Sequence, residues 1–297
     1  MQKKEFEILV TLTQTEDALT QRGIAEKTGL SLGTVNKAVK ELTAQGFISD
    51  GHITQQGLDA LEPYRVKRAI FLAAGFGSRM VPITFNTPKP LVRVHGQRII
   101  DSLLDAVVAA GIEEIYVVRG YLGEQFDQLL YKYPNIKFID NPFYNEANNI
   151  SSAMSVRHLF KNAYALEADL VLSNPKLIRK YEYSSNFLGI PVETSDDWCL
   201  YTDENGIIVE ECVGGQNCHQ LVGISYWDAD AGENLTSGSI DLFNQLCSLA
   251  PLGNTHQLQM ADLHMHTGTA GNVDHFFHSF KNAGTLVAHM HGENAVI

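Results

Sequence analysis

The chain has 297 residues, a length that exceeds one average domain. Hydrophobic residues make up 44% of it, which is enough for two separate cores. Its formal net charge of −12 argues against broad nonspecific binding to nucleic acid or anionic membrane, and no apolar run reaches the roughly 18 residues of a membrane span. The N-terminus lacks a signal-peptide pattern and the four cysteines are irregularly spaced, so we expect a cytoplasmic protein with reduced thiols.

Residues 1–65 predict a small helical domain. Apolar residues recur at helical spacing from Phe6 to Leu12, and Gly29 and Ser31 mark a tight turn and the cap of the next helix. That helix, residues 32–45, has one apolar and one polar face. Two β-prone pieces around an Asp-Gly turn and a final helix follow it, in an order that resembles a winged helix-turn-helix.

The polar face of the helix 32–45 offers side chains that could reach bases or phosphates. The DNA-binding candidates are Thr34, Asn36, Lys37 and Lys40. Residues 1–65 carry seven Lys and Arg against nine Asp and Glu, which is a poor electrostatic footprint for DNA. Dimerisation, or contact with the rest of the chain, is therefore the alternative role, and a homodimer stays open.

A second domain, residues 66–228, follows a linker at Pro63 and a basic stretch. Short apolar runs at 69–73 and 115–118 suit buried parallel strands, and residues 99–110 have the periodicity of a crossover helix. Further strands are expected at 137–139 and 170–172. The pattern predicts an α/β fold with a mostly parallel mixed sheet flanked by helices.

The C-terminal segment, residues 229–297, differs in composition. Of 22 Lys and Arg only Lys281 lies beyond Trp227, whereas seven of the 11 His do. These imidazoles could be metal ligands, but their H-x-H pairs lack a partner at a familiar spacing, and an irregular segment is the alternative. The candidates are His264, His266, His275, His278, His289 and His291.

The most informative stretch is LAAGFGSRMVPITFNTPKPL, residues 72–91, directly after a predicted strand. Gly75 and Gly77 allow the backbone to approach a triphosphate and present its N–H groups, and Arg79 and Lys89 supply positive charge. The string is neither a Walker loop nor a dinucleotide-binding fingerprint.

This stretch resembles the signature of the nucleotidyltransferase superfamily. NPFYNEANNISS, EADLVLSNP, DDWCLYTDENG and VGISYW narrow the resemblance to bacterial CTP:phosphocholine cytidylyltransferases. The resemblance implies a Rossmann-like nucleotidyltransferase that transfers CMP from CTP to phosphocholine, giving CDP-choline and pyrophosphate, with Mg²⁺ as cofactor. CTP and phosphocholine would be its small-molecule partners.

Carried onto this sequence, the resemblance makes Arg79 and Lys89 the catalytic cations and Asp169 the metal ligand, with a capping or surface aspartate as the alternative for Asp169. The nucleotide-binding candidates are Leu72, Ala73, Ala74, Gly75, Gly77, Asn148 and Asn149. The two asparagines would hydrogen-bond the base or the acceptor, and a turn is their alternative role.

Choline is a quaternary ammonium that cannot donate a hydrogen bond, so an aromatic box with a nearby carboxylate suits it. The choline-binding candidates are Trp198, Tyr226 and Trp227, with Tyr144, Tyr181 and Tyr183 as weaker ones. Core packing is the alternative role for each ring.

The chain departs from the family in its C-terminal segment. Family members usually have a second metal-binding aspartate in a D-I-x-E-I-D-like segment, which residues 229–297 lack. A shifted reading frame is one hypothesis for this, and it would put turnover in question. Two other functions stay open: a sugar-phosphate nucleotidylyltransferase, and a DNA-binding regulator whose transferase fold senses a nucleotide or choline metabolite.

Overall fold

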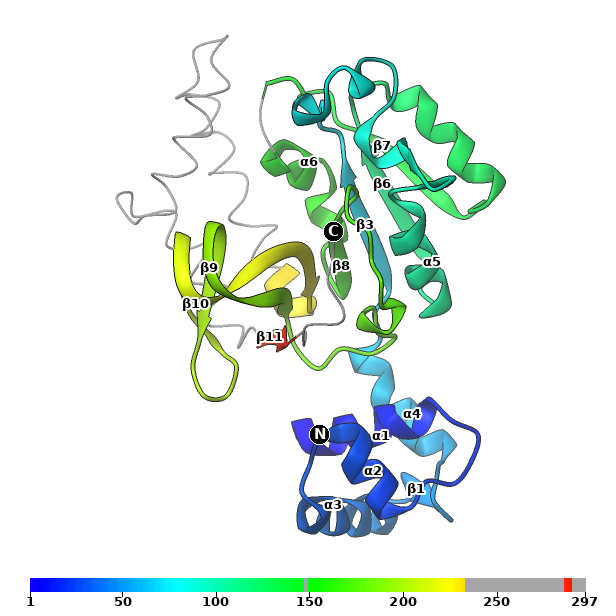
Figure 1. The fold of residues 1–297 in the computed structure, drawn as a ribbon. Helices are drawn as coiled ribbons and strands as arrows, with labels where there is room; N and C mark the ends of the chain where they lie inside the picture. Colours follow the sequence, from blue (N-terminus) through cyan, green and yellow to red (C-terminus); the bar gives the residue numbers. More distant parts are fainter. Residues whose placement is uncertain (147–148, 233–285, 290–297) are drawn as a thin grey trace. The chain divides into compact units, whose positions relative to one another are not determined.

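The computed structural model describes residues 1–146, 149–232 and 286–289 (Figure 1). They form two compact units, the first made of Met1–Arg65 with Tyr181–Tyr183 and the second of Val66–Lys180 with the described residues from Ser184 onward. Within these ranges, no helix has both the length and the apolar character to cross a membrane. The histidine candidates in the C-terminal segment lie outside the described residues, except His289.

The first unit has the predicted helix-turn-helix and wing. Its elements are α1 (Lys3–Thr13), α2 (Gln21–Thr28), α3 (Leu32–Ala44), β1 (Ile48–Ser49), β2 (His52–Ile53) and α4 (Gln55–Leu61). Thr20, Ser31 and Thr54 cap the last three helices, each accepting a hydrogen bond from the backbone N–H three residues on. Gly29 ends α2 in the left-handed conformation that a tight turn needs, with a φ of 70°.

The core of the first unit includes residues from a distant part of the chain. Buried side chains of α1 and α3 form most of it, namely Phe6, Ile8, Leu9, Val35, Ala38 and Leu42. Tyr181 is buried in the same cluster, and the Tyr183 ring stacks on Tyr64 with centroids 5.5 Å apart. The segment Tyr181–Tyr183 therefore completes the hydrophobic core of the winged-helix unit.

The second unit is built on a seven-stranded sheet of order β11-β9-β10-β8-β3-β6-β7. The strands are β3 (Arg68–Ala73), β6 (Glu114–Arg119), β7 (Ile136–Asp140), β8 (Ala163–Glu167), β9 (Asn186–Thr202), β10 (Ile208–Trp227) and β11 (Leu286–His289). β3 runs parallel to β6 and β8, and β6 runs parallel to β7, whereas β10 is antiparallel to β8. The carboxyl ends of four parallel strands thus share one edge, where such folds bind ligands.

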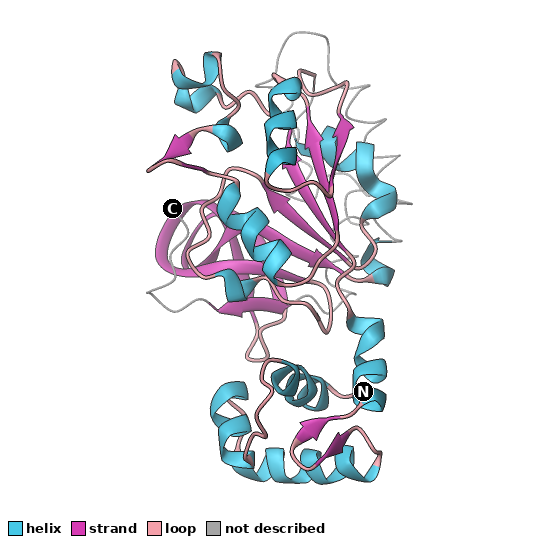
Figure 2. Ribbon diagram, turned by 90° about the vertical axis from the view of Figure 1, so that its right-hand side faces the viewer, coloured by secondary structure: helices cyan, strands magenta, loops and turns pink. Residues whose placement is uncertain are grey.

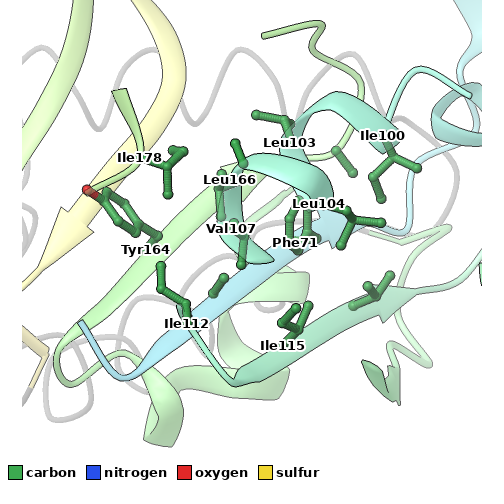
Figure 3. Packing of buried hydrophobic residues seen from close by; sticks show 14 of the residues in the cluster. Phe71, Ile100, Leu103, Leu104, Val107, Ile112, Ile115, Tyr164, Leu166 and Ile178 are labelled. Carbon is green, nitrogen blue, oxygen red and sulfur yellow. The ribbon is translucent and has the colours of Figure 1, made fainter. Parts of the chain in front are cut away.

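Helices cover both faces of this sheet, which Figure 2 shows by secondary structure. On one face α5 (Asp101–Ala109), the predicted crossover helix, packs Leu103, Leu104 and Val107 onto Phe71 of β3 and Leu166 of β8 (Figure 3). On the other face α6 (Asn149–Val156) packs its last residue, Val156, in a smaller cluster with Trp227. A sheet buried on both faces explains the nearly continuous apolar runs of β3 and β6.

The strand predicted at residues 170–172 is wrong. The strand in this region is β8, which pairs with β3 on one side and β10 on the other and ends at Glu167. Leu172 is buried in a loop. Its backbone N–H is satisfied there by the Ser102 hydroxyl, to which it donates a hydrogen bond of 2.9 Å. An apolar run of three residues can fill a core from a loop as well as from a strand.

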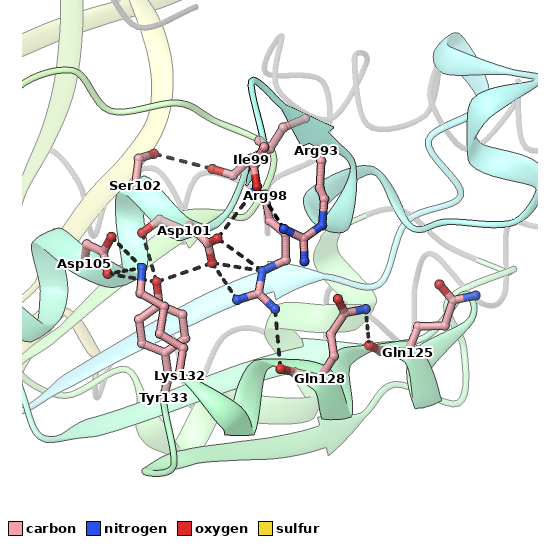
Figure 4. Close-up of polar contacts among 11 residues, drawn as sticks. Arg93, Arg98, Ile99, Asp101, Ser102, Asp105, Gln125, Gln128, Lys132 and Tyr133 are labelled. Carbon is pink, nitrogen blue, oxygen red and sulfur yellow. Dashed lines mark hydrogen bonds and ion pairs between the residues drawn. The ribbon is translucent and has the colours of Figure 1, made fainter.

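A short hairpin, β4 (Arg93–Val94) and β5 (Gln97–Arg98), is tied to α5 by buried polar contacts (Figure 4). The Arg98 guanidinium pairs with Asp101 at 3.0 Å, and both side chains are more than 90% buried. The Tyr133 hydroxyl donates to Asp105, 2.8 Å away. Burial raises the pKa of Tyr133, so its phenol stays a protonated donor.

Candidate active site

The glycine-rich loop follows the carboxyl end of β3 and runs through three short 3-10 turns to Leu91. Gly75 is exposed, and a side chain there would meet no other atom within 4 Å. Gly77 has a φ of 64°, and a Cβ on it would lie 3.0 Å from Thr84 and 3.1 Å from the Cβ of Lys89. Gly75 therefore leaves an open face, whereas Gly77 permits the turn that packs against Lys89.

Two candidates that are 80 residues apart meet at this loop. The Lys89 Nζ donates to the Asp169 carboxylate at 2.6 Å, and the two side chains are 28% and 30% exposed. Asp169 lies two residues beyond the end of β8, the neighbour of β3. Arg79 is exposed on the same loop and close enough to influence the charge on Glu167.

Glu167 is a site residue that the sequence analysis missed. It is the last residue of β8, paired with Leu72, and the register of β8 with β10 continues to place Gly223 opposite it. A Cβ on Gly223 would lie 2.6 Å from both Cδ and Oε2 of Glu167, so only glycine leaves room for this carboxyl group. The E-x-D spacing of Glu167 and Asp169 at the end of a buried strand was the sequence signal that could have identified it.

Fixed charges surround the Glu167 carboxyl. Burial raises its pKa, and the negative charges of Asp169 and Asp197 raise it further, whereas Lys89 and Arg79 lower it. The net direction is upward, so the carboxyl of Glu167 holds its proton at a higher pH than an ordinary glutamate. The site thus combines three carboxylates with two cations around the carboxyl end of β8.

The long strands β9 and β10 form a curled arm, visible in yellow-green in Figure 1. β9 pairs with two separate parts of β10, since Cys199 lies opposite both Cys212 and Gln220. Leu200 and Cys199 of β9 also pair with His219 and Gln220 of β10, which lie four and three residues before Gly223. The curl brings Asp197, two residues before Cys199, close enough to Glu167 for its negative charge to raise the pKa of that carboxyl.

Comparisons with known proteins agree with this arrangement. Residues 69–185 match the family model of a MobA-like NTP transferase domain, and residues 1–49 match that of a winged helix-turn-helix DNA-binding domain. A 2-aminoethylphosphonate cytidylyltransferase of Lancefieldella rimae is 37% identical over 180 residues, 60% of this chain and 73% of that protein. A choline-phosphate cytidylyltransferase of Haemophilus influenzae is 36% identical over 159 residues, 54% of this chain and 68% of that one.

The chain belongs to the cytidylyltransferase family. Its fold also resembles a solved CTP:phosphocholine cytidylyltransferase of Streptococcus pneumoniae, with a TM-score of 0.63 and 26% identity over 78% of this chain and 92% of that one. The predicted family, the nucleotidyltransferase fold and the enzyme class are confirmed.

In this cytidylyltransferase three further nucleotide-binding candidates lie at the carboxyl end of β3. Leu72 and Ala73 end β3, and the Ala74 carbonyl accepts a hydrogen bond from the Tyr121 N–H, 3.1 Å away. Asn148 lies outside the described residues, and Asn149 begins α6. The buried Asn141 anchors α6 instead, donating to Ser151 at 2.9 Å and to Ser152 at 3.1 Å.

The choline candidates fall into different places. Trp198 is half-buried on β9, whereas Tyr226 and Trp227 are buried core residues. Trp227 lies opposite Ala163, four residues from Glu167 along β8, which is about 13 Å at strand spacing. The structure therefore does not bring Tyr226 and Trp227 to the carboxyl edge, because Tyr226 packs in the core on the α5 face of the sheet and Trp227 in the cluster on the α6 face.

The three weaker choline-binding candidates also lie in different parts of the structure. Tyr181 and Tyr183 belong to the first unit. Tyr144 lies beside the glycine-rich loop, where its ring is 5.4 Å from that of Phe76, the residue between Gly75 and Gly77. The Phe76 ring also contacts Tyr121 at 5.1 Å, so these aromatic rings pack the loop against the ends of β6 and β7.

The carboxylates fit a divalent cation of the kind that the family uses. Among the residues that the structure describes, no group of three or more His, Cys, Asp or Glu side chains could hold a metal ion. Mg²⁺ is commonly bound by one or two carboxylates together with substrate phosphates. Asp169 at the end of β8 suits a cation shared with a triphosphate, rather than one held by protein alone.

The recognition-helix candidates lie on one helix of the first unit. Asn36, Lys37 and Lys40 are exposed on α3, and Thr34 is half-buried in its first turn, where its N–H donates to the Ser31 cap at 3.2 Å. Thr34 is therefore part of the helix cap as well as a candidate contact.

Proposed function

We propose that this cytidylyltransferase transfers CMP from CTP to phosphocholine, releasing pyrophosphate and forming CDP-choline. The Lys89–Asp169 pair, 2.6 Å long and on the loop that also presents the open face of Gly75, is the observation that carries the proposal. The loop offers backbone N–H groups and cations to a triphosphate, and the arm of β9 and β10 offers Trp198 and a carboxylate to a cationic acceptor.

In this reaction a phosphate oxygen of the acceptor attacks the α-phosphorus of CTP, and the bond to pyrophosphate breaks. Negative charge develops on the phosphate oxygens, so catalysis depends on positioning and on cations. Arg79 and Lys89 supply those cations, and the Lys89–Asp169 contact fixes the ammonium near the end of β8. Mg²⁺ held by Asp169 and the triphosphate would neutralise further charge.

The relatives support acceptors that share one chemistry. Phosphocholine and 2-aminoethylphosphonate, the acceptor named for the Lancefieldella rimae relative, both join a cationic nitrogen to a phosphorus oxyanion, the first through two carbons and an oxygen and the second through two carbons. A sugar phosphate has the oxyanion without the cation. Comparing these three acceptors therefore separates the proposal from its two nearest alternatives.

The deciding experiment measures pyrophosphate release from CTP and Mg²⁺ with phosphocholine, 2-aminoethylphosphonate or glucose 1-phosphate. We expect the highest kcat/KM with phosphocholine, and a loss of about 100-fold or more in Asp169→Asn. Glu193→Asn, an exposed position on β9, is the matched control and should retain activity. Tight CTP binding without pyrophosphate release would support the sensor alternative and overturn the transferase.

We further propose that the first unit binds DNA through α3. The match to a winged helix-turn-helix model and the exposure of Asn36, Lys37 and Lys40 on one helix support this role. Because the unit is net acidic, binding depends on these local lysines rather than on a general positive field.

The test is salt-dependent binding of the full chain to promoter fragments from its own locus. Lys37→Ala and Lys40→Ala should each lower the slope of log K against log salt concentration by about 1. Lys176→Ala, exposed on the second unit, should leave that slope unchanged. Unaltered slopes in both α3 variants would indicate that this helix does not contact DNA.

A further inference from the structure

Residues 120–125, which follow β6, reach the glycine-rich loop with two side chains. The Tyr121 hydroxyl donates a hydrogen bond to the Phe85 carbonyl, 3.1 Å away. The Gln125 amide nitrogen donates to the Asn86 carbonyl, 2.8 Å away. The donors lie 36 and 39 positions beyond their acceptors in the chain. We call these two hydrogen bonds the clasp, because they hold adjacent carbonyl groups of the loop from one neighbouring segment.

The segment that donates the clasp is itself firmly anchored. Arg119, the last residue of β6, pairs with Asp127 and with Asp140, each at 2.7 Å. Its guanidinium also donates to the Gly123 carbonyl at 3.2 Å. Leu122 has a φ of 48°, a left-handed conformation that persists only where the surrounding structure enforces it. The two donors of the clasp are therefore presented from a fixed position.

The glycine-rich loop is held differently at its two ends. At its start, a Cβ on Gly120 would lie 2.5 Å from Tyr144 and 3.0 Å from the Ala74 carbonyl, so the two segments pack closely there. Farther along the loop, Ile83 and Phe85 are 57% and 61% exposed. Burial of these two side chains contributes little to holding that limb of the loop, so its conformation depends more on hydrogen bonds such as those of the clasp.

The limb that the clasp holds lies between the two cations of the loop. Arg79 precedes it, and Lys89 follows three residues after Asn86. A loop without a fixed conformation must be ordered when a triphosphate binds, and that loss of conformational freedom weakens the observed affinity. A loop that is already ordered binds the same ligand more tightly.

We propose that Tyr121 and Gln125 are positioning residues that hold the glycine-rich loop in its CTP-binding conformation before the nucleotide arrives. This inference rests on the proposed function, in which the loop binds the triphosphate, and it gives a role to the segment after β6. It predicts that the clasp sets the affinity for CTP and leaves the chemical step unchanged, because bound CTP keeps the loop ordered with or without the clasp.

The test measures CTP binding by calorimetry with Mg²⁺ and without an acceptor. Tyr121→Phe removes the hydroxyl but keeps the ring, and Gln125→Met removes the amide but keeps the length of the side chain. Each change should raise the Kd for CTP by about two- to tenfold, the range expected for loss of one hydrogen bond. The double variant should exceed either single change. At saturating CTP, kcat should stay within about twofold of wild type.

Two exposed residues of the same types provide matched controls. Tyr131→Phe removes a hydroxyl from a tyrosine that is 97% exposed, and Gln97→Met removes an exposed amide on β5. Both variants should bind CTP as wild type does.

Hydrogen exchange gives a second readout, which a purely structural role would not change in this pattern. Without CTP, the amides of residues 78–86 should exchange faster in the double variant than in wild type. With saturating CTP, the two proteins should show similar protection. A clasp that serves stability alone would lower the midpoint of thermal unfolding and leave the Kd for CTP unchanged, which would contradict the inference.

The same measurements separate this inference from the proposed function. An unchanged Kd for CTP in the double variant, with normal turnover by wild type, would overturn the clasp and leave the transferase. Weaker CTP binding in the variants, without pyrophosphate release by wild type, would retain the clasp and overturn the transferase. A fall in kcat of about tenfold at saturating CTP would place the two side chains in the chemical step and contradict the inference.

Discussion

At the residue scale, Gly75 and Gly77 stand two positions apart but serve different purposes. A side chain on Gly75 would enter open space, where the triphosphate is proposed to lie. A side chain on Gly77 would meet Thr84 and Lys89 in a left-handed backbone conformation. Gly75 is thus needed for the approach of the proposed ligand, and Gly77 for the packing of the protein itself.

These roles make opposite predictions for alanine substitutions. Gly75→Ala should raise the KM for CTP severalfold and change the free energy of unfolding by less than about 0.5 kcal/mol. Gly77→Ala should destabilise the second unit by about 1–3 kcal/mol because of its backbone conformation. Thermal unfolding and CTP kinetics on both variants check this, and equal stability losses would contradict the distinction.

Lys89 is the second residue whose role can be isolated. Lys89→Met keeps the length of the side chain but removes the ammonium, so kcat should fall about 100-fold or more through lost charge stabilisation. The pair with Asp169 is about one-third exposed, so the stability change should stay below about 1 kcal/mol. Pyrophosphate release and thermal unfolding measure the two effects. A large loss of stability with normal kcat would show a structural ion pair.

At the element scale, the hairpin of β4 and β5 depends on a buried ion pair. Removing one partner leaves the other charge buried, so Arg98→Met should cost about 3–5 kcal/mol. The exposed pair of Lys132 and Asp105, at 2.8 Å in the same network, provides the control, and Lys132→Met should cost less than about 1 kcal/mol. Denaturant unfolding of both variants tests this ranking, and similar costs would show that burial of the Arg98 pair is unimportant.

Strand patterns predict β3, β6 and β7 of the sheet, and the helical period predicts α5, but neither predicts β8, β9 or β10. The apolar run at 170–172 predicts a strand, whereas Ala163–Glu167 carries the pairing with β3 and β10. Glu167 was not predicted because the space for its carboxyl group depends on Gly223, 56 positions later in the chain. Local patterns contain no information about which distant backbone lies opposite a strand end.

At the scale of the whole molecule, the first unit includes Tyr181–Tyr183, three residues from the part of the chain that otherwise forms the second unit. The Tyr183 hydroxyl donates to the Met1 carbonyl at 3.1 Å, and its ring packs on Phe6 with centroids 5.4 Å apart. Tyr181 is 5% exposed in the same core. The winged helix of this chain is therefore not a contiguous segment.

Tyr183→Ala should accordingly destabilise the N-terminal unit by about 2–4 kcal/mol, although the residue is 118 positions beyond Arg65. Calorimetry of the full chain, or protection of α1 and α3 amides from hydrogen exchange, measures the effect. Tyr131→Ala provides the control, because Tyr131 is 97% exposed on the second unit. Unchanged amide protection in α1 would show that the unit does not need the distant segment.

The sequence by itself determined the two folds and the family, and it predicts a triphosphate site at the glycine-rich loop. Helix caps, hydrophobic periodicity and the motif at residues 72–91 depend on residues that are close in the sequence, so they can be predicted from it. Only the tertiary structure decided that Lys89 meets Asp169, that Gly223 admits Glu167 and that Tyr226 and Trp227 lie in the core. Those outcomes depend on strand order, register and the curl of β9 and β10, which bring together residues that no spacing in the sequence relates.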